Sequence, residues 1–174
     1  MIKKNRFLGD ISLYVWLGTC NLTSKDKNGN ISLTCWRNHT IDTVIKGYNE
    51  IVEIVKKKYP NCKVTILELP VYSISTYRKV SDTFENQDTE LSKQIFEINK
   101  NIRAINRSSQ ASSPEFSSDL YKKSKYKVGY HRDTKYRCYY NFNLYRDGIH
   151  SGQTLSKVWL RKISNRMYQD CWSQ

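Results

Sequence analysis

The sequence lacks any long hydrophobic run. No apolar stretch approaches the ~20 residues that a transmembrane helix requires, so we expect no membrane span. The basic start, residues 1–6, is followed by an apolar stretch that Gly9 and Asp10 interrupt and that has no small-residue cleavage site, so no signal peptide is predicted. Both absences favour an intracellular protein.

Paired cysteine motifs are also missing. The five cysteines are odd in number and widely spaced, and no C-x-x-C occurs among them: Cys20, Cys35, Cys62, Cys138 and Cys171. This pattern argues against both a disulfide framework and a zinc site. We therefore expect free thiols in a reducing compartment, and we predict neither a metal nor another cofactor.

Acidic residues are few. The chain has 29 Lys and Arg against 16 Asp and Glu, which gives a net charge of +13 and a pI near 9.5. Such an excess indicates affinity for polyanions, or simply a solvated basic surface, and both interpretations stay open. The hydrophobic share of 39% and the length of 174 residues are typical of one globular domain, residues 1–174.

The order of the apolar segments predicts an α/β fold. Two strand-like runs, residues 11–17 and 63–69, flank a helical repeat over about 41–58, which makes a βαβ unit with parallel strands. A second helix is predicted around Leu91 to Ile105, a weak third strand at 115–120, and a last helix at about 152–170. We therefore expect a three-layer, flavodoxin-like parallel sheet of about three strands, with helices on both faces.

A tight turn, Asp147-Gly148-Ile149-His150, comes directly before the last predicted helix. A carboxylate three residues before a histidine can orient the imidazole and stabilise its protonated form, so that the imidazole can activate a hydroxyl. The pair Asp147 and His150 is therefore a candidate general base. The pattern is short, however, and a plain capping turn is the competing interpretation.

A second candidate element follows the first predicted strand, which ends in Gly18-Thr19-Cys20-Asn21. Together, these two elements resemble the SGNH (GDSL-type) hydrolase superfamily. Gly18 to Asn21 are similar to its G-x-N-D block and Asp147 to His150 to its D-x-x-H block, and the likeness covers about the C-terminal two thirds of such a domain. It implies an SGNH-type fold, an ester substrate, a catalytic Asp147–His150 pair, and an oxyanion region at Gly18, Cys20 and Asn21.

The departures from the family pattern are specific. No G-D-S nucleophile block occurs, and Gly9-Asp10-Ile11-Ser12 precedes its apolar run instead of following it, so Ser12 receives no nucleophile role. Cys20 stands where the family has its oxyanion-binding Asn, and losing one such donor typically costs about 10²–10³ in rate. We therefore expect an esterase-like or acyl hydrolase-like domain that is inactive or impaired as an isolated chain, and whether it is an enzyme stays open.

The resemblance also implies two further upstream strands that this sequence does not contain, as in an N-terminally truncated domain. The predicted strand at 11–17 would then be an apolar sheet edge, which favours self-association.

The segment 121–137 is rich in lysine and tyrosine. Cations contact phosphates and tyrosine rings stack on bases, so the segment favours a non-catalytic module that binds single-stranded nucleic acid. The competing interpretation is a solvated insertion that folds over the cleft as a lid. The candidate contact residues are Lys122, Lys123, Lys125, Tyr126, Lys127 and Tyr130.

Overall fold

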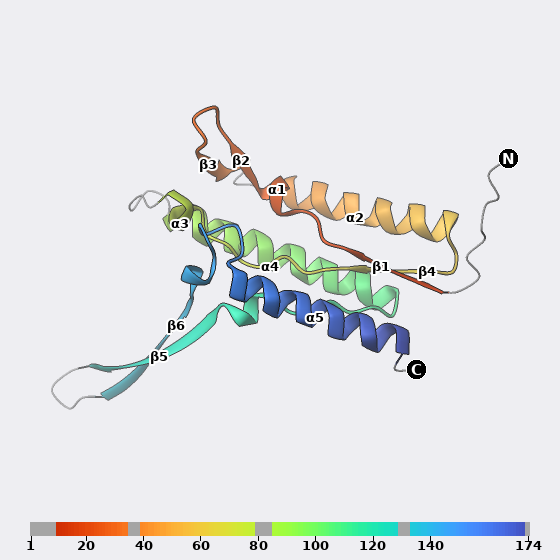
Figure 1. The fold of residues 1–174 in the computed structure, drawn as a ribbon. Coiled ribbons are helices and arrows are strands. Elements are labelled where there is room, and N and C mark those ends of the chain that lie inside the picture. The colour runs from red at the N-terminus through yellow and green to blue at the C-terminus, as the bar shows by residue number, and fades with distance from the viewer. Residues whose placement is uncertain (1–9, 35–38, 79–84, 129–132, 173–174) are drawn as a thin grey trace.

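Two parallel strands lie at the centre of the molecule. The computed structural model describes residues 10–34, 39–78, 85–128 and 133–172 (Figure 1). Strand β1 (Ile11–Val15) pairs with β4 (Cys62–Ile66), with Ile11 opposite Cys62 and Val15 opposite Ile66. The long helix α2 (His39–Lys58) lies between them in sequence, so the predicted parallel β–α–β order is confirmed.

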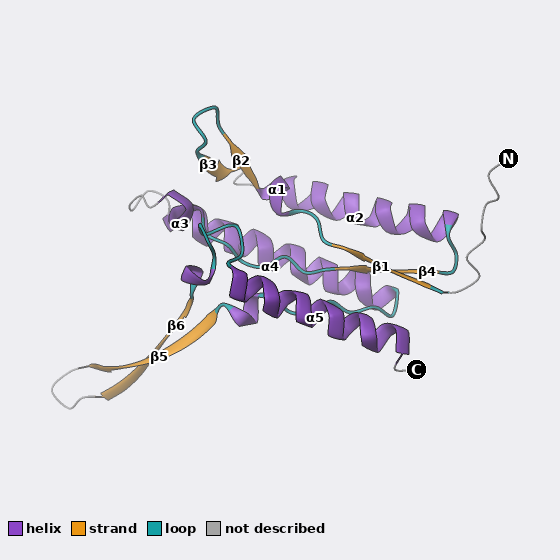
Figure 2. Ribbon diagram, viewed as in Figure 1, coloured by secondary structure: helices purple, strands orange, loops and turns teal. Residues whose placement is uncertain are grey.

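The long helices pack around this pair, and the two antiparallel hairpins project away from it (Figure 2). The Asn28-Gly29 turn joins a short hairpin, and Gly29 has the positive φ of 82° that such a turn needs. The remaining elements are α1 (Thr19–Leu22), β2 (Thr23–Lys25), β3 (Ile31–Leu33), α3 (Ile74–Arg78), α4 (Glu85–Ser108), the 3₁₀ turn η1 (Ser117–Asp119), β5 (Tyr121–Val128), β6 (Asp133–Tyr140), the 3₁₀ turn η2 (Phe142–Leu144) and α5 (Gln153–Trp172).

The core lies where the apolar faces of the helices pack against the two strands. The buried faces of α2 and α4 follow the helical period and pack against each other and against β4. Helix α5 packs along β1, where Trp159 and Trp16 enclose the fully buried Phe116. The Trp16 and Phe116 ring centroids are 4.9 Å apart, and the rings are stacked.

The expected third parallel strand at 115–120 is wrong, because this segment contains η1. On the side of β4 that does not face β1, side chains from α4 bond to the backbone in place of a neighbouring strand. They do the same for the residues that directly follow β4. The Asn106 amide accepts from Ile66 N–H at 2.9 Å and donates to Ile66 O at 2.7 Å, and Asn99 does the same for Leu69 at 2.7 Å each. The described residues thus form a mixed α/β fold with two-stranded sheets, of which only β1–β4 is parallel.

The outer edge of β1 is open in the part of the chain that the structure describes. Ile11 N–H bonds to Asn61 O at 3.0 Å and Leu67 N–H bonds to Val15 O at 2.8 Å. In a parallel ladder these bonds place the peptide groups of the alternate residues, Ser12 and Tyr14, on the side away from β4.

Helix α5 is attached to the strands by a charged cluster around Asp170. The Asp170 carboxylate, with only 4% of its side chain exposed, accepts from Arg166 at 2.5 and 3.0 Å and from Tyr14 Oη at 2.5 Å, and lies 3.7 Å from Lys63 Nζ. Burial of this carboxyl favours its neutral form. The hydrogen bonds and positive charges outweigh that effect, so the pKa of Asp170 lies below its ordinary value.

Replacing Asp170 by asparagine is expected to weaken the fold and to flatten its acid dependence. Because the folded pKa is lowered, the carboxylate stabilises the fold fully above its ordinary pKa, near ~3.9, and this contribution disappears as pH falls through the lower folded pKa. At pH 7 we expect a loss of about 1.5–3 kcal/mol, the range for hydrogen bonds to a charged group. Urea unfolding at pH 7, 5 and 3 measures both effects. The expectation fails if the parent loses no more stability in acid than Asp170→Asn.

Candidate active site

The turn between η2 and α5 holds the Asp147–His150 pair in bonded contact. His150 Nδ1 lies 2.7 Å from Asp147 Oδ2, while Asp147 Oδ1 accepts from the N–H groups of His150 at 2.8 Å and Ile149 at 3.1 Å. Both carboxylate oxygens are therefore engaged, which fixes the orientation of the ring. The His150 side chain is 60% exposed, so its second ring nitrogen is available to a ligand.

The Asp147 carboxyl is held in its ionised form. Burial disfavours the charge, but the hydrogen bonds from His150 and Ile149 and the charge interaction with His150 outweigh it and lower the pKa of Asp147. Arg146 Nη2 lies 3.6 Å from the same carboxylate. At neutral pH, Asp147 is therefore the anion that an imidazolium partner requires.

Gly148 determines where this turn can lie. Its φ is +88°, and a Cβ atom there would stand 2.8 Å from Ser73 O, Thr76 Cβ and Tyr77 N. Its carbonyl accepts from Ser73 N–H at 3.0 Å. Only glycine combines this backbone conformation with so close an approach, so the turn docks on the segment after β4.

That segment is itself held by Asp88 of α4. Asp88 Oδ2 accepts from the hydroxyls of Ser73 at 2.7 Å and Ser75 at 2.5 Å, and Oδ1 accepts from Ile74 N–H at 2.6 Å. The contacts connect α3 to α4 beneath the Asp147–His150 turn. No local sequence pattern predicts this support, because Asp88 lies 15 residues after Ser73.

A pocket of about 390 Å³ lies beside His150. Its walls come from three places in the chain: the end of β1, the segment after β4, and the region from the turn to α5. Tyr72 Oη donates to Thr19 O at 3.1 Å and thereby joins two of these walls. The lining residues are Trp16, Thr19, Pro70, Tyr72, Tyr145, Arg146, Ile149, His150, Ser151 and Trp159.

The predicted oxyanion residues are sequence neighbours of residues that line this pocket, but they do not line it themselves. Gly18 has a φ of +107°, and a Cβ there would lie 2.5 Å from the hydroxyl of Tyr48. Cys20 and Asn21 are exposed on α1, and Asn21 N–H donates to Gly18 O at 3.0 Å. Their neighbour Thr19 is the residue that shares the pocket with His150. The structure thus explains Gly18 by backbone conformation and close packing.

No described serine hydroxyl is hydrogen-bonded to His150. Ser12 lines a different groove with Pro60 and Asn61, at the start of the two parallel strands. Ser73 is buried and bonded to Asp88, and Ser151 Oγ is 2.7 Å from Ser156 Oγ. Within the described ranges, His150 therefore lies beside a pocket, and no hydroxyl is hydrogen-bonded to its ring.

No three or more His, Cys, Asp or Glu side chains among the described residues are grouped so that they could hold a metal ion. No helix in the same residues has the length and apolar character to cross a membrane. The described cysteines Cys20, Cys62, Cys138 and Cys171 are free thiols.

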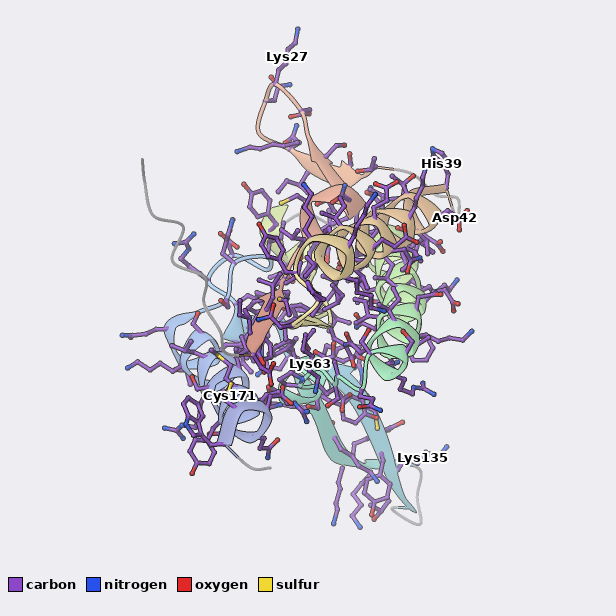
Figure 3. The ribbon with its side chains drawn as sticks, turned by 90° about the vertical axis from the view of Figure 1, so that its right-hand side faces the viewer. Lys27, His39, Asp42, Lys63, Lys135 and Cys171 are labelled. Atoms are coloured by element: carbon purple, nitrogen blue, oxygen red, sulfur yellow. The ribbon has the colours of Figure 1, made fainter. Side chains whose placement is uncertain are left out.

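The lysine- and tyrosine-rich segment forms an antiparallel ribbon, β5–β6, which we call the basic ribbon. It extends away from the helices instead of covering the pocket as a lid, and Lys135 lies far out on it (Figures 1 and 3). The ribbon continues to Tyr140, beyond the expected limit of the insertion at residue 137. Candidate residue Tyr130 lies outside the described residues. The ribbon candidates that the structure describes are Lys122, Lys123, Lys125, Tyr126 and Lys127.

Comparison with known proteins identifies no relative. No protein-family model, curated protein or solved structure matches this chain significantly.

Proposed function

We propose that this chain is an SGNH-type ester or acyl hydrolase-like domain that contributes the general base and part of the substrate pocket. The observation that carries the proposal is the 2.7 Å contact between His150 Nδ1 and Asp147 Oδ2 at a pocket of about 390 Å³. A capping turn requires only the two backbone bonds to Asp147 Oδ1. The side-chain contact goes beyond that need and orients an exposed imidazole.

The proposed chemistry is proton transfer. His150 Nε2 takes the proton from an attacking hydroxyl, and the Asp147 carboxylate stabilises the imidazolium that forms. The same nitrogen then returns the proton to the departing alcohol of the ester. Four aromatic residues line the pocket and suit an apolar acyl group: Trp16, Tyr72, Tyr145 and Trp159.

The nucleophile is proposed to come from a segment that pairs with the open edge of β1. A strand added there in parallel would end beside the pocket, where a hydroxyl on its following loop would approach His150. Such an addition would extend the parallel sheet toward the three-layer SGNH arrangement. The added strand could belong to a second copy of the chain, which would make the edge at residues 11–17 a site of self-association.

Small nucleophiles provide the test, because they can replace a missing hydroxyl. Alone, the chain should release p-nitrophenol from short p-nitrophenyl esters poorly or not at all. Adding methanol or hydroxylamine should give acyl transfer that saturates with ester and falls by roughly 10²-fold in His150→Ala, the lower range for general base catalysis. Asp147→Asn should also lower this rate. The measurements are p-nitrophenol release and the yield of methyl ester or hydroxamate.

His39→Ala is the matched control, because any exposed imidazole reacts slowly with activated esters. His39 is exposed at the start of α2 and does not line the pocket (Figure 3). If parent, His39→Ala and His150→Ala transfer the acyl group at equal rates, the hydrolase proposal is wrong. Efficient hydrolysis without added nucleophile that His150→Ala abolishes would instead show that this chain supplies its own nucleophile.

A further inference from the structure

The register of the basic ribbon assigns its side chains to two faces. Directly opposed residues share a face, and neighbours along a strand alternate between faces. One, which we call the anchor face, carries Tyr121, Lys123, Lys125, Tyr136 and Tyr140. The other, which we call the open face, carries Lys122, Tyr126, Lys135, Arg137 and Tyr139.

The tyrosines of the anchor face already have partners. The Tyr121 and Tyr140 ring centroids are 5.9 Å apart, and Tyr140 leads through Phe142, at 6.2 Å, to the buried Tyr145, a further 6.3 Å away. This aromatic chain attaches the base of the ribbon to the core. Farther out, Lys123 Nζ lies 4.2 Å from the centroid of the Tyr136 ring and makes a cation–π contact with it.

The tyrosines of the open face are exposed and flanked by cations. Tyr126 is 47% exposed and Tyr139 is 42% exposed, and the structure records no ring-stacking or cation–π contact between either of them and another described residue. Tyr126 is opposite Lys135, Tyr139 is opposite Lys122, and Arg137 lies on the same face between these pairs. The two rings are separated by about 13 Å along the ribbon, from the rise of ~3.3 Å per residue.

We propose that the open face of the basic ribbon binds single-stranded nucleic acid. Lys122, Lys135 and Arg137 contact successive phosphates, and Tyr126 and Tyr139 stack on unpaired bases. An unpaired strand exposes both groups at once. A duplex offers the phosphates while its bases stay stacked on each other, so the tyrosines favour the single strand. This binding is independent of the hydrolase chemistry proposed for His150.

The two faces supply a matched pair of tyrosine variants. Tyr126 and Tyr136 are both mid-strand and about half exposed, at 47% and 50%, but lie on opposite faces. Fluorescence anisotropy with a labelled oligothymidylate should show binding weakened about 5- to 150-fold in Tyr126→Ala, the loss of one stacked base. Tyr136→Ala should bind nearly as the parent does, and a duplex of equal length should respond to neither substitution.

Charge-matched variants separate a site from general attraction. Replacing Lys122, Lys135 and Arg137 by Gln removes the same charge as replacing Lys123, Lys125 and Lys127. The open-face triple variant should flatten the dependence of affinity on salt more than its counterpart, because its cations are the ones that displace counterions. Circular dichroism and ester assays on each variant check that the fold and the His150 site are retained.

Three outcomes would overturn the proposal. If the two triple variants lose equal amounts of affinity and Tyr126→Ala binds as tightly as the parent, the ribbon attracts nucleic acid only through its general positive charge. Equal affinity for the single strand and the duplex would mean that phosphates alone are recognised. Absence of binding at low salt would remove nucleic acid as the partner of this surface.

Discussion

Replacing Asn106 by leucine is expected to lower the free energy of unfolding by about 2–6 kcal/mol, although the two side chains are similar in size. Asn106 is 2% exposed, and its amide satisfies both the N–H and the C=O of Ile66. Leucine would leave both groups buried without a partner, at about 1–3 kcal/mol each. Asn106→Asp would keep an acceptor for Ile66 N–H but lose the donor to Ile66 O and bury a charge, so it should cost at least as much. Urea unfolding measures these losses.

Asn101→Leu is the control for this prediction. Asn101 lies on the same helix and is only partly buried, and its side chain bonds to Glu97 O within α4. Its replacement should change stability by about 0.5 kcal/mol or less, as is usual for substitutions away from the core. Equal costs at Asn101 and Asn106 would show that the α4 amides do not act as a substitute for a strand.

Replacing Gly148 by alanine is expected to affect stability and site geometry together. The positive φ of +88° is unfavourable for alanine, and the new Cβ would stand 2.8 Å from two backbone atoms, Ser73 O and Tyr77 N. Strain and crowding together should cost about 2–4 kcal/mol. Because the Asp147–His150 turn must move away from Ser73, acyl transfer to an added nucleophile should fall by up to roughly 10²-fold, the effect of a displacement of about 1 Å.

Gly47→Ala is the matched substitution. Gly47 lies inside α2 with nothing within 4 Å of an added Cβ, so alanine should stabilise the chain by about 0.5–1 kcal/mol. Thermal and urea unfolding compare the stabilities of the two variants, and the ester assay compares their rates of acyl transfer. If Gly148→Ala were as stable and as active as the parent, the turn would not be docked on the Ser73–Tyr77 segment.

Local pattern was sufficient for several elements. The spacing of Val44, Tyr48 and Val52 predicts α2, and the apolar runs on either side of it predict the two parallel strands. Asn28-Gly29 is a strong hairpin or turn signal, and it joins β2 to β3. These features depend on periodicity and on the conformation of single residues, which the amino-acid order determines directly.

Other features depended on residues that are distant in sequence. Phe116 and Leu120 suggested a third strand because they are apolar, yet both are buried around η1, while Asn99 and Asn106 close the strand edge. An asparagine on a helix carries no local sign that its amide will bond to a strand. Only the packing of α4 against β4 brings the amides into reach of those peptide groups.

The candidate sites show the same division. The sequence by itself determined that a glycine turn places Asp147 close to His150, and that the basic ribbon is rich in interleaved lysines and tyrosines. The tertiary structure decided that Trp16, Tyr72 and Trp159 form a pocket beside that pair, and the pairing register decided which ribbon tyrosines stay open. The reason is physical: conformation within a turn follows from neighbouring residues, whereas a pocket or a ribbon face exists only after separate segments have packed or paired.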